Sequence, residues 1–142
     1  MGLIGFPKGQ SSVEFLSIVG IALVISAPFM LSAQQSLIDI ERSSEAITLQ
    51  KSMDKLEESV STVSVSGEPA RRTFLMELPD NVEKARIVQD RAVVYTLDRS
   101  SGKTNVSRIF DTNISAPRGL PNSTKRIGVY AWNGQVNISE VK

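Results

Sequence analysis

The sequence contains neither cysteine nor histidine among its 142 residues. Without cysteine there are no disulfides, no thiolate metal sites and no cysteine nucleophiles. Without histidine, the usual general base near neutral pH and the commonest metal ligand are both missing. The sequence also lacks a glycine-rich phosphate loop, a zinc or calcium ligand spacing and a G-x-S-x-G nucleophile elbow. We therefore expect no enzyme, no cofactor and no metal site.

Charge is scarce in one part of the chain and balanced in the rest. The 16 lysine and arginine residues and the 15 aspartate and glutamate residues leave a net charge of +1, and residues 15–31 carry no charge at all. No basic patch with interleaved aromatic residues is present, so nucleic acid is not an expected partner. The chain is an apolar N-terminal segment followed by a water-soluble remainder.

The apolar segment is long enough to cross a membrane, although a carboxylate stands at its edge. Residues 15–31 contain ten leucine, isoleucine, valine or phenylalanine residues. Together they favour insertion by about 3 to 6 kcal/mol. A charge at the centre of such a helix costs roughly 2.5 to 3.5 kcal/mol, and Glu14, at the edge, should cost less. The segment is expected to insert as a helix despite Glu14, since about 20 residues span a bilayer.

Three simple interpretations of this segment are open. A secretory signal would be cleaved after Ala33, but Leu31 is too large for the −3 position and only Lys8 supplies a basic n-region. A plain membrane anchor explains the length but not Glu14. A core helix of a soluble protein, apolar on all sides, needs a large protein around it, which the rest of the chain does not supply.

A fourth interpretation takes account of the residues in front of the segment. Lys8 and Gly9 precede the run QSSVE, and the apolar stretch follows. This arrangement resembles the class III signal peptide of euryarchaeal type IV pilin-like proteins. In that family a short basic leader ends in glycine, and the mature chain begins Gln-x-Ser-x-Glu. Gln10, Ser12 and Glu14 occupy those positions here.

One position departs mildly from the family pattern. The family usually has a leucine four residues after the glutamate, whereas this chain has Ile18 there and Leu16 two residues earlier. The resemblance implies that a prepilin peptidase cuts between Gly9 and Gln10. The domain organisation it implies is a leader at 1–9, a long helix at 10–66, apolar over 13–33 and amphipathic over 34–66, and a β-rich head at 67–142.

Glu14 has two compatible roles at the start of this helix. With Ser11 as the N-cap, Glu14 would complete a capping box that satisfies free amide groups. After cleavage, the new amine of Gln10 in one copy could also pair with Glu14 of another copy. Inside a bundle of apolar helices an unpaired charge is costly, so this pairing would favour one axial register. We therefore predict that Glu14 sets the register of assembly.

The helical pattern continues beyond the apolar segment, with apolar residues at spacings of three and four. The first series is Ala33, Leu37, Ile40, Ser44 and Ile47, and the second, after a shift of phase, is Leu49, Met53, Leu56, Val60 and Val63. Gly67 and Pro69 are expected to end the helix, which would then be about 80 Å long at 1.5 Å per residue. Its second half can pack on a head, and Pro28 is expected to kink or locally unwind it. Alternatively, residues 60–65 are already loop or strand.

After Pro69 the pattern predicts short strands. They are expected at 71–78, 82–88, 91–97, 103–110, 112–116, 125–132 and 135–138. Asn133-Gly134 between alternating apolar residues is the strongest hairpin signal in the chain. The predicted fold class is α+β: a long N-terminal helix and then a small antiparallel sheet or sandwich. Tyr130 and Trp132, on one face of the hairpin, are expected in the core rather than in a ligand platform.

Candidate glycosylation sites in the head suggest that the head lies outside the cell. Four N-x-S/T sequons occur, at Asn105, Asn113, Asn122 and Asn137, and each is a candidate N-glycosylation site. Alternating strands can produce such sequons by themselves, but alternation also places Asn137 on the solvent face. Glu57-Glu58 is expected on a solvated helix face. Arg71-Arg72 is expected to face solvent or a neighbouring subunit rather than an anionic ligand.

Together these observations predict a structural subunit of an archaeal type IV pilus-like filament. The resemblance implies a membrane-inserted precursor, processing by a prepilin peptidase, and assembly with copies of itself on a pilus assembly platform into an extracellular filament, with adhesion as its use. An archaellum-type subunit for motility and a single-pass, membrane-anchored extracellular binding module are the alternatives.

Overall fold

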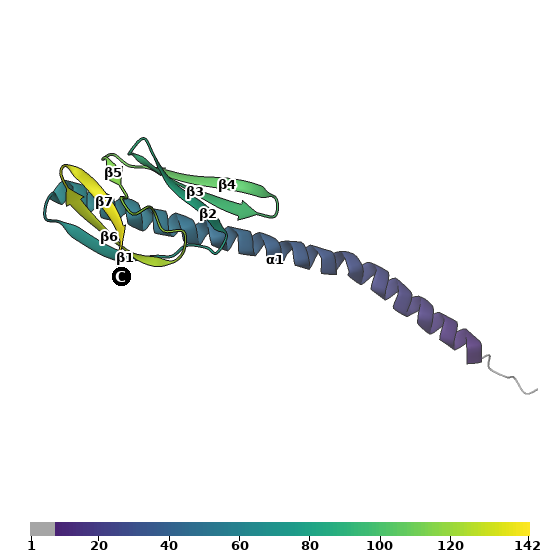
Figure 1. Cartoon of the computed structure of the whole chain (residues 1–142). Helices are drawn as coiled ribbons and strands as arrows, with labels where there is room; N and C mark the ends of the chain where they lie inside the picture. The colour runs from purple at the N-terminus through teal and green to yellow at the C-terminus, as the bar shows by residue number, and fades with distance from the viewer. Residues whose placement is uncertain (1–7) are drawn as a thin grey trace, which may run out of the picture. The chain divides into compact units, whose positions relative to one another are not determined.

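The computed structural model describes residues 8–142, which form one long helix and seven strands (Figure 1). The elements are α1 (Lys8–Ser66), β1 (Arg71–Met76), β2 (Val82–Val88), β3 (Ala92–Arg99), β4 (Gly102–Ile109), β5 (Ile114–Ser115), β6 (Lys125–Trp132) and β7 (Gln135–Glu140). The predicted α+β class, a long helix followed by a small β-rich head, is confirmed. Residues 1–7 of the predicted leader lie outside the described residues.

The chain divides into two compact units, and the boundary falls inside α1. The first unit ends at Ser43, and the second runs from Ser44 to Lys142. The second unit contains the last turns of α1 together with all seven strands. The head is therefore larger than the β-rich segment alone, because part of the helix belongs to it.

The start of α1 differs from the prediction. The helix begins at Lys8, three residues before the predicted cap. A capping residue needs a non-helical backbone, so Ser11, which lies inside the helix, does not form the predicted capping box with Glu14. The helix also continues through Pro28 without unwinding. A proline removes one backbone hydrogen bond, but the turns on either side keep theirs.

The end of α1 follows the sequence signal. Gly67 has a φ of +66°, and its amide donates a hydrogen bond to the carbonyl of Val63 at 3.0 Å. Glycine adopts this left-handed conformation at the smallest steric cost, which is why it commonly follows the last helical residue. Residues 60–65 are consequently helical rather than loop or strand.

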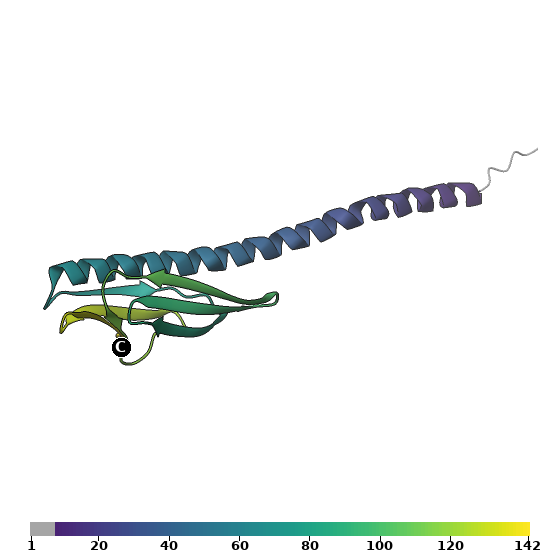
Figure 2. The same cartoon turned by 90° about the horizontal axis from the view of Figure 1, so that it is seen from above.

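The strands form two separate sheets. One has the order β1-β6-β7-β5 and the other the order β2-β3-β4, and both lie along the last turns of α1 in the two views (Figures 1 and 2). All pairs are antiparallel except β5 and β7, which are parallel. The chain reverses between β5 and β6 and again between β6 and β7, so β5 and β7 run in the same direction. The predicted antiparallel sheet is therefore mixed at one edge.

Two tight turns use left-handed backbone conformations, and the sequence signals that conformation at only one of them. Asn133 and Gly134 have φ values of +52° and +73° between β6 and β7, the geometry expected for an Asn-Gly hairpin. Between β2 and β3, Gln89 and Asp90 have φ values of +53° and +54°. The predicted strands 82–88 and 91–97 leave a break at these two residues, but no glycine stands there to signal the left-handed backbone.

The core of the head lies between the last turns of α1 and the inner faces of the sheets. The second helical series is fully buried, as predicted: Leu49, Met53, Leu56, Val60 and Val63. Tyr95 on β3 is also fully buried, and its hydroxyl contacts Met76 Sδ at 3.8 Å. Burial raises the pKa of the Tyr95 phenol far above its usual value, so the side chain stays neutral. The first helical series, by contrast, is not buried.

One expectation about the core is wrong. Trp132 has 59% of its surface exposed, and Tyr130 is half-buried. The buried positions of β6 include Ile127 and Val129. Because successive strand residues point to opposite faces, the residues at 130 and 132 lie on the outer face of the sheet.

Charged residues of α1 pair with the edges of the sheets. Arg108 on β4 binds Asp54 and also Glu57, at 3.2 Å. Arg72 on β1 binds Glu58 at 3.3 Å. These carboxylates are partly exposed, and exposed pairs contribute little stability. The ion pairs favour one rotation of α1 about its axis against the sheets. Burial of the second apolar series supplies most of the attraction between α1 and the sheets.

We predict that Leu56→Ala destabilises the head by about 2 to 5 kcal/mol, because it removes a fully buried side chain and leaves a cavity. The matched control is Lys55→Ala, at the exposed neighbouring position, which should change stability by less than about 0.5 kcal/mol. Amide hydrogen exchange at the centres of β3 and β6, in the detergent-solubilised full chain, measures the stability change in each variant. Equal exchange in the two variants would contradict the assignment of α1 to the core of the head.

Candidate functional site

The predicted processing and assembly residues lie together in the first turns of α1. Lys8 is the first helical residue, and Gly9 and Gln10 follow it. Ser12 and Glu14 are exposed within the helix. The side chains of Lys8 and Gln10 lie outside what the structure describes.

Among the described residues, none packs closely against Gly9. A Cβ atom added there would meet nothing within 4 Å, although glycine in a helix is less favourable than alanine by about 0.5 to 1 kcal/mol. Contacts with the described residues therefore do not account for glycine at this position. Recognition by another protein would account for it.

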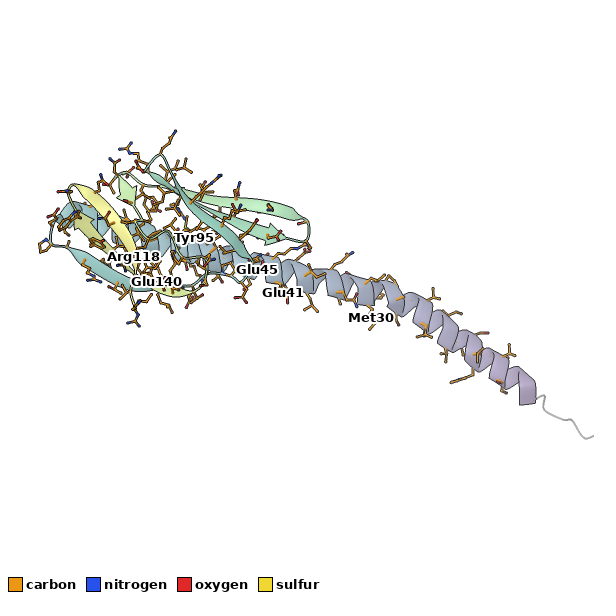
Figure 3. The ribbon with its side chains drawn as sticks, viewed as in Figure 1. Met30, Glu41, Glu45, Tyr95, Arg118 and Glu140 are labelled. Atoms are coloured by element: carbon orange, nitrogen blue, oxygen red, sulfur yellow. The ribbon has the colours of Figure 1, made fainter. Side chains whose placement is uncertain are left out.

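The helix that follows presents an apolar surface that the chain leaves uncovered. Side chains project from it around the helix axis, with Met30 labelled in Figure 3. The exposed residues up to the end of the predicted apolar segment are Val13, Phe15, Leu16, Ile18, Val19, Ile21, Leu23, Val24, Ile25, Phe29, Met30 and Leu31. Fully burying one such side chain is worth about 1.5 to 3 kcal/mol, so this surface strongly favours a covered state.

Serine hydroxyls within this surface are satisfied by the helix itself. Ser17 donates a hydrogen bond to the carbonyl of Val13 at 2.8 Å, and Ser26 donates to the carbonyl of Ala22 at 2.7 Å. A polar group without a partner is costly in an apolar environment, whereas a hydroxyl bonded to the carbonyl four residues earlier needs no water. The two serines are thus compatible with lipid or with a bundle of helices.

Length and composition allow this helix to cross a membrane. Within residues 8–142 one helix, Ser11–Ser66, is long enough and apolar enough to cross a membrane. Its most apolar stretch is not buried by the described residues. The core helix of a soluble protein would be mostly buried. The uncovered surface therefore favours a partner outside the chain, either lipid or other apolar helices.

Glu14 is an isolated charge on this surface. Between Lys8 and Asp39 the sequence has no other charged residue. Glu14 is exposed, and no described residue forms an ion pair with it. A carboxylate at the edge of a covered apolar surface needs a counter-charge, which the described residues do not supply.

The four sequons differ in their surroundings. Asn105 is exposed on the edge strand β4 and accepts a hydrogen bond from the Thr96 hydroxyl at 2.8 Å. Asn113 and Asn122 are exposed outside the strands. Asn137 is half-buried, because β7 lies between β6 and β5 in the four-stranded sheet. Three of the acceptors are thus openly accessible, and Asn137 is less so.

Neither metal ligation by the described residues nor similarity to known proteins indicates a function. Within residues 8–142 no group of three or more aspartate, glutamate, histidine or cysteine side chains could hold a metal ion. No protein-family model, curated protein or solved structure matches the chain.

Proposed function

We propose that this chain is a structural subunit of an archaeal type IV pilus-like surface filament, which polymerises through the apolar part of α1. The observation that carries the proposal is an apolar helix surface that the chain leaves uncovered and that begins at the QSSVE motif with its single carboxylate. A filament core made of such helices would cover this surface.

The first step in the proposed mechanism is removal of the leader between Gly9 and Gln10. This bond lies in the first turn of α1, where the amides have no acceptor within the helix. Opening the turn for a peptidase therefore costs few hydrogen bonds. Cleavage removes Lys8 and leaves 16 − 1 = 15 basic residues against 15 acidic ones.

Cleavage also creates a charge that Glu14 can neutralise. The new amine at Gln10 is positive and stands at the positive end of the helix dipole, where a cation is unfavourable. A carboxylate near this end is favourable for the same reason. In a bundle the Glu14 carboxylate of one copy would approach the amine of a neighbour, and this pairing would favour one axial register.

Transfer from lipid to the filament core exchanges one apolar environment for another. The hydrophobic effect changes little in such a transfer, so close packing of side chains between helices supplies the attraction. Hydroxyl groups that are already satisfied within the helix, such as those of Ser17 and Ser26, do not oppose it.

The head would form the exterior of the filament, where its exposed sequons are accessible to glycosylation. The proposed use is adhesion. A membrane-anchored extracellular binding module would use the same apolar helix, but it would not require cleavage or a partner for Glu14. The N-terminus and the assembly state therefore distinguish the two functions.

We predict that Gly9→Val blocks removal of the leader, because a branched side chain replaces the glycine before the scissile bond. Mass spectrometry of the N-terminus, in cells that supply a prepilin peptidase, should find Gln10 as the first residue of the unmodified chain and an intact leader on the variant. Gly20→Val is the matched control, since a Cβ at Gly20 also meets nothing within 4 Å. An intact leader on the unmodified chain would refute the proposed processing.

Glu14→Gln should allow cleavage but lower the yield of filaments by about tenfold or more, since it leaves the buried amine of a neighbour without its partner. The control is Glu41→Gln, which removes another exposed carboxylate of α1. Filament yield is measured by electron microscopy and by the protein sheared from cells. Unchanged yield for Glu14→Gln would remove this residue from the assembly mechanism.

Glycopeptide mass spectrometry of protein from the native host should find sugar on Asn105, Asn113 and Asn122, and the lowest occupancy on Asn137. The physical reason is accessibility, because Asn137 is half-buried between two paired strands. Asn133 is exposed but not part of a sequon, so it serves as the unmodified control. Highest occupancy at Asn137 would contradict the argument from accessibility.

A further inference from the structure

The outer face of the four-stranded sheet has an unusual charge distribution. Its inner face is fixed by buried residues of β1, β6 and β7, and successive strand residues alternate between faces. The outward residues of these three strands are Arg71, Thr73, Leu75, Arg126, Gly128, Tyr130, Trp132, Gln135, Asn137 and Ser139. This set contains cations and two aromatic rings but no carboxylate, although the whole chain is nearly neutral.

A cavity of about 310 Å³ lies on this face. It is lined by Arg71, Tyr130 and Ser139 from three strands, and by Pro117 and Arg118 from the segment between β5 and β6. Ligand pockets begin at about 300 Å³, so the cavity suits a small ligand. Its lining therefore includes two arginines, a tyrosine and a serine.

The Arg71 side chain lies beside Gly128 on the neighbouring strand β6. A Cβ atom added to Gly128 would come within 3.4 Å of Arg71 Nη2 and 3.0 Å of Val141 Cγ2. The φ of Gly128 is not positive, so the backbone there does not require glycine. The missing side chain instead leaves room for Val141 and for the Arg71 guanidinium, which lies beside Gly128.

Arg118, labelled in Figure 3, lies in a turn that restrains its backbone. The Gly119 amide donates a hydrogen bond to the carbonyl of Ala116 at 2.9 Å, which closes a four-residue turn. Pro117 at the second position of the turn has a fixed φ, which favours this conformation before any contact forms. The backbone that carries Arg118 is therefore restrained beside the cavity.

Both arginines lack a counter-charge among the described residues. Arg72 and Arg108 each form ion pairs with carboxylates of α1, whereas Arg71 and Arg118 form none. A planar guanidinium binds a carboxylate through two parallel hydrogen bonds. A carboxylate between the two groups would also relieve their mutual repulsion.

We propose that this cavity binds an acidic saccharide, a sugar that carries a carboxylate, supplied from outside the chain. The carboxylate accepts hydrogen bonds from Arg71 and Arg118, the apolar side of the sugar ring packs on Tyr130 and Pro117, and the Ser139 hydroxyl binds a sugar hydroxyl. An inorganic anion would use the arginines but not the apolar surface. The site gives the proposed adhesive role a ligand and does not depend on polymerisation.

A second source of the same chemistry lies on this face. Asn137 is the strand partner of Tyr130, so a glycan attached to Asn137 would start beside the cavity. The lower accessibility of Asn137 favours an external saccharide as the occupant. Comparing unglycosylated protein with protein from the native host separates the two sources.

The test is calorimetric titration of the full chain, unglycosylated and in detergent micelles, with trigalacturonate and with a neutral trigalactoside of the same linkage. The acidic trisaccharide should bind at least about tenfold more tightly, the ratio expected for loss of one charged hydrogen-bonding group. Arg71→Gln and Arg118→Gln should each weaken binding by about tenfold or more. Arg86→Gln makes the same charge change at an exposed position on the other sheet and should leave binding within about twofold of the original.

Several results would overturn the proposal. They are equal binding of the neutral sugar, an equal loss in Arg86→Gln, and displacement of the trisaccharide by an equal concentration of inorganic phosphate. Binding that is absent only in the glycosylated protein would assign the cavity to the chain's own glycan and would also overturn it. Filament yield is scored separately, so normal filaments without saccharide binding reject this site alone. Saccharide binding without filaments rejects the assembly proposal alone.

Discussion

Uncovered apolar surface along the first part of α1 is the constraint on which the rest of this molecule depends. The cost of leaving a row of leucine, isoleucine, valine and phenylalanine side chains in water exceeds the stability of a typical domain. A covered state of this surface is therefore strongly favoured, and the proposed filament core would provide one. Its hydroxyl groups are satisfied by the helix, and its single carboxylate stands at one end. Each of these features suits a helix that is exchanged between two apolar environments.

The same helix also organises the head. Between Ile47 and Leu49 the apolar series changes phase, and burial begins at Leu49. The residues after this point pack beneath both sheets, so neither sheet has to form a core alone. A small two-sheet head without cysteine gains a third layer of apolar side chains in this way. That layer adds buried apolar surface, which a domain of this size needs for stability.

The outer surface of the head differs from its inner surface in how its arginines are paired. Ion pairs satisfy the arginines that face α1, whereas the outward arginines beside Tyr130 form no ion pair with any residue from 8 to 142. Gly128 and the turn that begins at Ala116 place two of these cations at one cavity. The arrangement concentrates positive charge and aromatic surface where the chain does not use them for folding. A binding role explains both features together.

Some of this structure was predictable because it depends on local chemistry. The helix end at Gly67 and the Asn133-Gly134 hairpin follow from backbone preferences of single residues. The buried helical series from Leu49 to Val63 follows from the spacing of apolar residues, and so does the α+β class. The QSSVE run with Glu14 is also visible in the sequence, because a lone carboxylate before an uncharged run is a local pattern, and its role in processing and assembly stays a prediction.

The remaining features depend on contacts between distant residues. The parallel edge strand β5, the exposure of Trp132 and the convergence of Arg71 and Arg118 arise from strand order, which no short stretch encodes. The break at Gln89-Asp90 follows from the predicted strand bounds, but its left-handed backbone was not predicted, because neither residue is a glycine, for which that conformation has the smallest steric cost. The sequence by itself determined where the apolar helix lies and where its charge stands, since hydropathy and charge are properties of single residues. Only the tertiary structure decided which face of each strand is covered, because burial is a property of neighbours brought together by the fold.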